Sequence, residues 1–248
     1  MMRTANPALN TNTFSDVRSF TRTEAMTIQG TVNKTGFLLL LLILSAGYVW
    51  HLFTKAPDPA MITPYLLVGT LGGLVAALIT VFKKTWSPVT APIYAVLEGL
   101  ALGGISAIFE AQFQGIVIQA VGLTFGTLFA LLLAYKSGLI KATENFKLGV
   151  FAATGGIALL YFVTFILGLF KVNVSFMHDS SLLSIGISVF VVIIAALNLV
   201  LDFDFIEKGA ESGAPKFMEW YAGFGLLVTL VWLYLEILRL LAKMQKRR

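Results

Sequence analysis

Cysteine is absent from the 248-residue sequence, and charged residues are scarce. Without cysteine the chain has no disulfide framework, no thiolate metal site and no cysteine nucleophile. Charged residues make up 12% of the sequence, whereas soluble globular domains contain roughly 25%. So few charges cannot cover the surface of a water-soluble protein of this length, and that class is excluded.

Signature motifs of common enzymes are also missing. The two histidines, His51 and His178, are neither spaced for a metal ion nor placed on one segment. The sequence contains no HExxH, no phosphate-binding P-loop and no GxSxG. We therefore expect neither an enzyme nor a cofactor. The net charge of +5 comes from basic residues at segment ends instead of a stripe, which disfavours a nucleic-acid partner.

Hydrophobic residues make up 57% of the chain and gather in seven stretches. Each is near the ~20 residues that span a ~30 Å hydrocarbon core as a helix. None alternates polar and apolar residues as barrel strands do, so helices are the remaining spanning structure. The sequence predicts an all-α integral membrane protein, a seven-transmembrane helix bundle in contact with the lipid bilayer. The approximate limits are 36–53, 63–82, 91–109, 115–135, 148–170, 181–203 and 217–242.

The remaining segments are short tails and loops. Residues 1–35 are polar and contain acidic residues, so we interpret them as a retained N-terminal tail and not a signal peptide. Residues 36–242 form one transmembrane domain, and residues 243–248 form a basic C-terminal tail.

Lysine and arginine counts favour a cytoplasmic N-terminus, with eleven on that side against six on the other. The C-terminal cluster conflicts with this orientation, because seven full crossings place its four charges outside. Either the seventh segment is re-entrant or the earlier charges dominate.

Small residues recur in two stretches. Gly99 and Gly103 form a GxxxG pattern, and Gly69 to Gly73 is a similar run. Such patterns let two helices approach closely. They can form a dimer face, but internal packing of the bundle is the favoured interpretation.

Four acidic residues within or beside the apolar stretches are candidates for function, because ionisable groups are costly inside a membrane. Asp204 and Glu236 each have a basic residue one turn later, Lys208 and Arg239, so local ion pairs are the simpler explanation for them. Glu98 has no local partner. Asp202 has only Asn198, one turn earlier, as a possible hydrogen-bond donor.

Buried carboxylates with few compensating cations favour taking up a proton or sharing a cation. Oxygen ligands suit hard cations such as calcium. These residues therefore predict a pH-sensitive cation site.

Several stretches resemble the Bax inhibitor-1 family, in its bacterial membrane-protein branch, over nearly the whole chain from about residue 25. They are Met26-Thr-Ile-Gln-Gly-Thr-Val-Asn-Lys-Thr-Gly36, Pro92-Ile-Tyr-Ala-Val-Leu-Glu-Gly-Leu-Ala-Leu-Gly-Gly104, Asp202-Phe-Asp-Phe-Ile-Glu-Lys-Gly209, Glu219-Trp-Tyr221 and Trp232-Leu-Tyr-Leu-Glu-Ile-Leu-Arg-Leu-Leu241.

The resemblance implies a seven-helix bundle with its C-terminal helix at the centre, located in the bacterial inner membrane. It also implies a proton-sensitive calcium leak controlled by a carboxylate pair, here Asp202 and Glu236, which would form a hypothetical calcium site if their helices bring them together. An alternative role, implied by some bacterial relatives, is a regulator of membrane-protein quality control that binds a membrane protease. The charged tails would then matter more than the buried carboxylates.

This sequence departs from the family in the spacing of that pair. Asp202 and Glu236 are 34 residues apart, about ten more than the family pattern, and ten residues add roughly three helical turns. Straight helices would place Asp202 nearer one membrane face and Glu236 nearer the other. A kink at Gly223 or Gly225 could restore contact.

Overall fold

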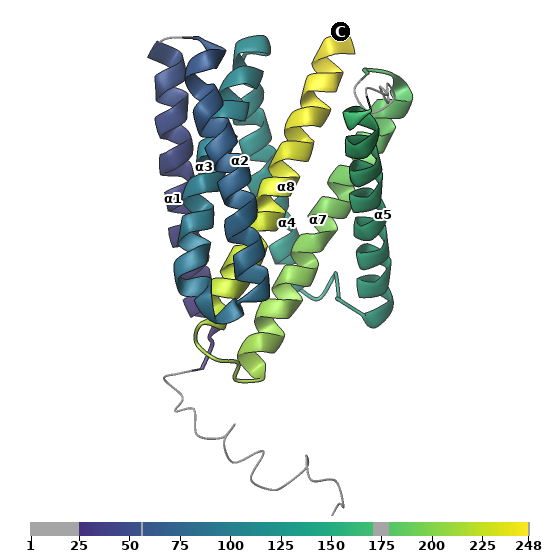
Figure 1. Cartoon of the computed structure of the whole chain (residues 1–248). Coiled ribbons are helices and arrows are strands. Elements are labelled where there is room, and N and C mark those ends of the chain that lie inside the picture. Colours follow the sequence, from purple (N-terminus) through teal and green to yellow (C-terminus); the bar gives the residue numbers. More distant parts are fainter. Residues whose placement is uncertain (1–24, 56, 171–178, 248) are drawn as a thin grey trace, which may run out of the picture.

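The computed structural model describes residues 25–55, 57–170 and 179–247. Within these ranges seven helices are long and apolar enough to cross a membrane, and they stand side by side as a bundle (Figure 1). The predicted all-α membrane fold is confirmed. The helices are α1 (Ile28–Lys55), α2 (Pro59–Phe82), α3 (Ser87–Gln112, preceded by the short η1, Lys84–Trp86), α4 (Ile116–Lys136), α5 (Glu144–Leu169), α7 (Leu182–Glu211) and α8 (Met218–Arg247).

Polar residues just before three of the helices fix where they begin. Asp58 accepts a hydrogen bond from the Ala60 backbone N–H at 2.9 Å, and Pro59 provides a first helical residue that needs no amide partner. Thr143 caps α5, and Ser181 caps α7, each through its hydroxyl. These caps satisfy N–H groups that lipid could not satisfy.

Two helices are longer than their apolar cores. α1 begins at Ile28 instead of 36, and α7 ends at Glu211 instead of 203. The added first turns of α1 are polar, yet Thr31 and Thr35 are buried by the bundle. Their hydroxyls donate to backbone carbonyls one turn back, at 3.0 and 2.9 Å, so hydropathy alone could not locate the start of this helix.

Both predicted tails therefore need new boundaries. Residues 28–35 belong to α1, and α8 continues to Arg247, so Lys243, Lys246 and Arg247 are helical. Residues 1–24, together with Lys171 and His178, lie outside the described residues.

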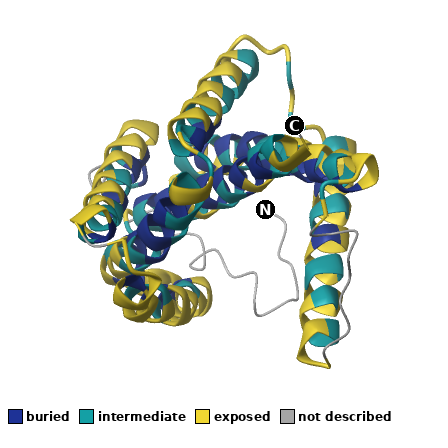
Figure 2. Ribbon diagram, turned by 90° about the horizontal axis from the view of Figure 1, so that it is seen from above, coloured by how far each residue is buried: buried dark blue, intermediate teal, exposed yellow. Residues whose placement is uncertain are grey.

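α8 occupies the centre of the bundle, as the resemblance implied. It packs against α1, α3, α4 and α7, and Figure 2 shows buried residues concentrated along the middle of the molecule. Leu227, Leu233 and Leu238 of this helix are fully buried. A helix covered on several sides must be apolar nearly all round. The hydropathy of the seventh segment therefore predicts a membrane span although the segment contains charges.

The glycines of the two patterns lie at contacts between helices inside the bundle. A side chain on Gly99 or Gly103 would collide with α1, at Leu42 and Ser45 or at Ala46. Gly69 of α2 approaches the α3 backbone equally closely. The favoured interpretation, internal packing, matches this arrangement, since these faces already have a helix against them.

α8 is one continuous helix, and its C-terminal end lies at the opposite end of the bundle from the α7–α8 turn (Figure 1). The re-entrant alternative for the seventh segment is therefore wrong. The C-terminal basic residues lie at the end of the bundle opposite to the beginning of α1.

Candidate functional site

Asp202 lies on α7, where it faces α8 in the interior of the bundle. The side chain of Thr229 on α8 lies beside its carboxylate. Oδ2 of Asp202 is buried and has no hydrogen-bond partner among the described residues. No described lysine or arginine forms an ion pair with it. A buried carboxylate oxygen without a partner is costly if ionised, and no charge in the described part of the chain compensates Asp202 directly.

Asn198 does not provide the hydrogen bond that its spacing allowed. Its side-chain amide donates instead to the Thr154 hydroxyl of α5 and to the Ile194 carbonyl, both at 2.8 Å. Both amide hydrogens are therefore engaged elsewhere, and Asp202 is left without them.

Glu236, on α8, is the opposite case, because it is 2% exposed and one of its carboxylate oxygens has three hydrogen-bond donors. Its Oε1 accepts hydrogen bonds from the Tyr161 hydroxyl at 2.9 Å, the Trp232 indole N–H at 3.2 Å and the Arg239 guanidinium at 2.9 Å. The predicted pair with Arg239 is confirmed. The contact with Tyr161 of α5 was not predictable, because nothing in the sequence indicates which helix lies opposite Glu236.

The structure does not bring Asp202 and Glu236 together. Asp202 lies beside Thr229, and Glu236 is seven residues further along α8, which is about 10 Å of helix rise. α8 runs through Gly223 and Gly225 without interruption, so no break there restores contact. In this arrangement the two carboxylates cannot hold one calcium ion between them.

Asp204 lies at an ion-paired end of α7. It contacts Lys208 at 3.0 Å, as its spacing predicted, and also Lys147 of α5 at 2.9 Å. Two cations compensate this carboxylate, so it joins α5 to α7 and is not a free site.

Glu98 lies on α3 and faces α2, where its carboxylate comes close to Gly73. Tyr94, one turn earlier, is its electrostatic neighbour. No hydrogen bond or ion pair joins Glu98 to another described side chain. Glu98 is thus a second uncompensated carboxylate, on a different face of the bundle from the α7–α8 contact.

Glu219 was not among the predicted site residues, although it is fully buried. It forms ion pairs with Lys34 of α1 and, at 2.8 Å, with Lys216. It also accepts a 2.9 Å hydrogen bond from the Thr27 backbone. This cluster fastens the start of α1 to the start of α8. The sequence signals were the three-residue spacing of Lys216 and Glu219 and the location of Lys34 and Glu219 in stretches shared with the family.

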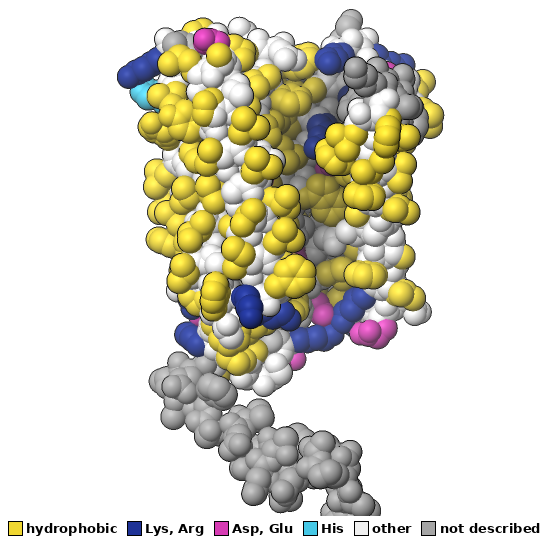
Figure 3. Space-filling view, viewed as in Figure 1, with side chains coloured by type: hydrophobic (Ala, Val, Ile, Leu, Met, Phe, Trp, Pro, Cys, Tyr) yellow, Lys and Arg dark blue, Asp and Glu magenta, His cyan; other side chains and the backbone are white. Residues whose placement is uncertain are grey.

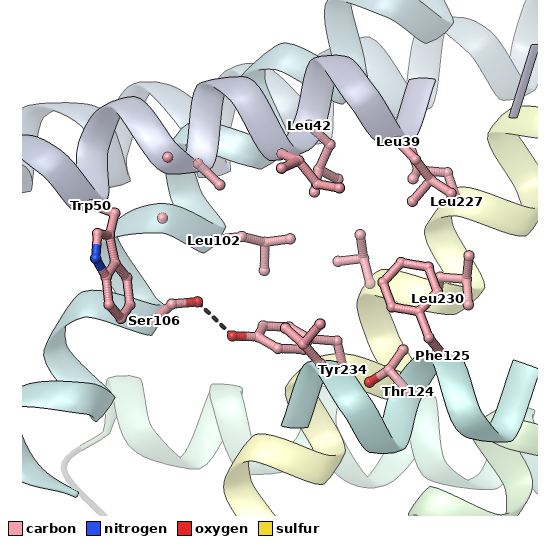
Figure 4. Close-up of a pocket in the computed structure, with 16 residues that line it drawn as sticks. Leu39, Leu42, Trp50, Leu102, Ser106, Thr124, Phe125, Leu227, Leu230 and Tyr234 are labelled. Carbon is pink, nitrogen blue, oxygen red and sulfur yellow. Dashed lines mark hydrogen bonds between the residues drawn. The ribbon is translucent and has the colours of Figure 1, made fainter. Parts of the chain in front are cut away.

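Two cavities of the bundle differ in their chemistry. The first, about 320 Å³, lies between α1, α3, α4 and α8 and has no charged residue in its lining. In Figure 4, Ser106 and Tyr234 point toward each other at one side of it and share a 2.6 Å hydrogen bond. The second, about 740 Å³, lies among α3, α5, α7 and α8 and contains Glu236, Arg239 and Lys243.

No group of three or more histidine, cysteine, aspartate or glutamate side chains in the described ranges could hold a metal ion. The fold and the site thus define a polytopic helical membrane protein with isolated carboxylates in its interior.

The family follows from comparison with known proteins. A family model described as "Bax inhibitor 1 like" matches residues 6–246, so the chain belongs to that family. No curated protein and no solved structure matches the chain.

Proposed function

We propose that the protein is a pH-sensitive cation leak channel, with calcium as a transported ion and Asp202 as its proton-sensitive group. The observation that carries the proposal is the buried, unpartnered Oδ2 of Asp202 on a helix that crosses the membrane. Ionisable residues in such positions commonly mark ion and proton pathways. An ionised Asp202 attracts a cation, and a protonated one does not.

Glu236 takes a different role in this proposal. It lines the charged cavity and is neutralised by Arg239, so it holds α5 and α8 together as a gate and does not bind the ion. Between Thr229 and Glu236, α8 contributes the buried Leu230 and Leu233. This apolar stretch closes the path from the cavity to Asp202, so conduction requires α8 to move relative to its neighbours.

The test is calcium flux into proteoliposomes containing the purified protein, measured from mildly acidic to mildly alkaline pH. Because protonation removes the charge that attracts the cation, flux should fall as pH falls. Asp202→Asn, which mimics the protonated state, should show the low acidic flux at every pH. Asp204→Asn is the matched control, because it removes a carboxylate two residues away that already has two lysine partners.

Unchanged flux and pH profile in Asp202→Asn would remove Asp202 from the pathway. A flux that responds to Glu236→Gln but not to Asp202→Asn would move the proton-sensitive group to the charged cavity.

The proposal includes location in a bacterial inner membrane with a cytoplasmic N-terminus. The lysines of the η1 and α4–α5 regions support this orientation, since they lie at the same end of the bundle as the beginning of α1.

Binding to a membrane protease is the competing function. It depends on the tails, and residues 1–24 lie outside the described part of the chain. Deletion of residues 1–24 separates the two functions: loss of a co-purified partner without loss of flux would favour the interaction role.

A further inference from the structure

The second cavity combines basic side chains with an apolar wall. Figure 3 shows lysine or arginine side chains set into a hollow between the body of the bundle and α5. The basic residues of this cavity are Arg239 and Lys243, and Glu236 is its acidic residue. The lining therefore carries two positive charges and one negative charge.

The negative charge of Glu236 is already paired with Arg239. Glu236 is almost fully buried and binds Arg239 through one guanidinium nitrogen, which also contacts the Tyr161 hydroxyl at 3.4 Å. The Arg239 side chain nevertheless remains 47% exposed. Because a guanidinium has five N–H donors, this arginine keeps donors available for an acidic group in the cavity.

Lys243 has no carboxylate partner within ion-pair distance among the described residues. It donates a 2.8 Å hydrogen bond to the Ser188 hydroxyl of α7, which leaves its charge uncompensated. Glu236 and Asp179 influence it only at longer range; Glu236 is paired with Arg239, and Asp179 accepts a 2.8 Å hydrogen bond from Ser181. The cavity thus offers two cationic donors, one helical turn apart on α8, and lacks an anion to match the second.

The depth of these residues matches the level of lipid headgroups. α8 has 30 residues, a length of ~45 Å, which exceeds the ~30 Å hydrocarbon core by ~7 Å at each end when centred. Lys243 is four residues, or ~6 Å, from the end of the helix, and Arg239 is one turn deeper. Lys243 therefore lies at the boundary of the hydrocarbon, and Arg239 lies just inside it.

The rest of the lining suits an acyl chain. Beside the charges, the cavity wall includes apolar side chains from α3, α5 and α7, namely Phe109, Phe165, Leu169, Ile187 and Val191. A ligand with an acidic head and an apolar tail would match both parts of the site. A free anion would use only the basic side chains of the cavity.

We propose that the cavity between α5, α7 and α8 is a binding site for an anionic phospholipid, with its headgroup phosphate on Arg239 and Lys243 and an acyl chain along the apolar wall. Arginine suits this task because its planar donors match phosphate oxygens. The site is separate from Asp202 and does not depend on the proposed cation flux.

The experiment uses quenching of Trp232, which lies one turn from Glu236 and contacts it. The other three tryptophans, Trp50, Trp86 and Trp220, are replaced by phenylalanine in the full-length chain. The protein in a non-ionic detergent is titrated with brominated phosphatidylglycerol or with brominated phosphatidylcholine. We expect the anionic lipid to quench at a lower concentration than the zwitterionic one.

Lys243→Gln should reduce this preference about fivefold, because one basic residue near the headgroups contributes ~1 kcal/mol. Lys246→Gln is the matched control, since it removes the same charge from the same end of α8 at an exposed position outside the cavity. It should leave the preference unchanged. The double variant Glu236→Gln/Arg239→Gln removes the buried ion pair as a unit and should also weaken the preference.

Equal quenching by both lipids would overturn the proposal, and so would equal losses in Lys243→Gln and Lys246→Gln. Competition by inorganic phosphate that abolishes the quenching preference would show a site for free anions, which also contradicts a lipid site.

Discussion

Asp202 and Glu236 are the acidic residues placed deepest in α7 and α8. Both lie inside the bundle, but they have no hydrogen-bond or ion-pair partner in common. Glu236 is neutralised by Arg239 and accepts hydrogen bonds from Tyr161 and Trp232, whereas Asp202 keeps one buried oxygen without a hydrogen bond among the described residues. The two carboxylates therefore respond to different substitutions, and the difference can be measured.

The ion pair of Glu236 provides the first prediction. Arg239→Gln should lower the free energy of unfolding by about 3 kcal/mol, because it leaves the buried Glu236 carboxylate without its cation. Glu236→Gln should cost less, since Arg239 is half exposed and can reach water. In a double-mutant cycle, measured by reversible unfolding in mixed micelles, the pair should couple by at least about 1 kcal/mol. If the two single losses of unfolding free energy add up to the loss in the double variant, the ion pair has no coupling energy, which would contradict this prediction.

Glu219 provides the second prediction. Glu219→Gln should destabilise the protein by about 2 kcal/mol, because Lys34, Lys216 and the Thr27 backbone lose or weaken their hydrogen bonds to a buried carboxylate. Thermal unfolding in detergent measures the change. Glu144→Gln is the control: its side chain is 89% exposed and its ion pair with Lys147 lies at the surface, so its effect should stay below about 0.5 kcal/mol. Equal effects of the two substitutions would contradict a buried clamp between α1 and α8.

The α1–α3 contact provides the third prediction. Gly103→Ala should cost about 2 kcal/mol, because the new methyl group meets the backbone of Ala46 and forces the helices apart. Gly122→Ala, at a helical glycine with open space around it, should be neutral or should stabilise the protein by up to about 1 kcal/mol. The comparison of the two unfolding curves checks the assignment. A stable Gly103→Ala variant would show that the packing is looser than described.

The sequence predicted what depends on hydropathy and local spacing. Seven spans follow from the lengths of the apolar runs, and Asp204–Lys208 and Glu236–Arg239 follow from one-turn spacing. The separation of Asp202 from Glu236 was also foreseeable, because α7 and α8 are straight enough for their 34-residue spacing to translate into depth.

Contacts between distant segments could not be foreseen in the same way. Lys34 and Glu219 are 185 residues apart, and their pairing depends on α1 beginning at Ile28. That start is invisible to hydropathy, because Thr31 and Thr35 are polar residues buried within the bundle, Thr35 against Gly223 of α8. Tyr161 and Lys147 likewise reach their acidic partners only because α5 packs beside α7.

The charged cavity shows a related limit. Arg239 and Lys243 were visible in the sequence as ordinary basic residues near a helix end. The sequence could not show that these two residues line a cavity, because the rest of its wall comes from the distant helices α5 and α7.

Infrared difference spectroscopy of the protein in lipid, recorded during acidification, tests the central claim most directly. Asp202 should give a carboxylic-acid C=O band that grows as pH falls, is missing in Asp202→Asn and persists in Asp204→Asn. Its midpoint should coincide with the midpoint of calcium flux. A band that is unchanged in Asp202→Asn, or a flux midpoint unrelated to the band, would contradict the assignment of Asp202 as the proton-sensitive group.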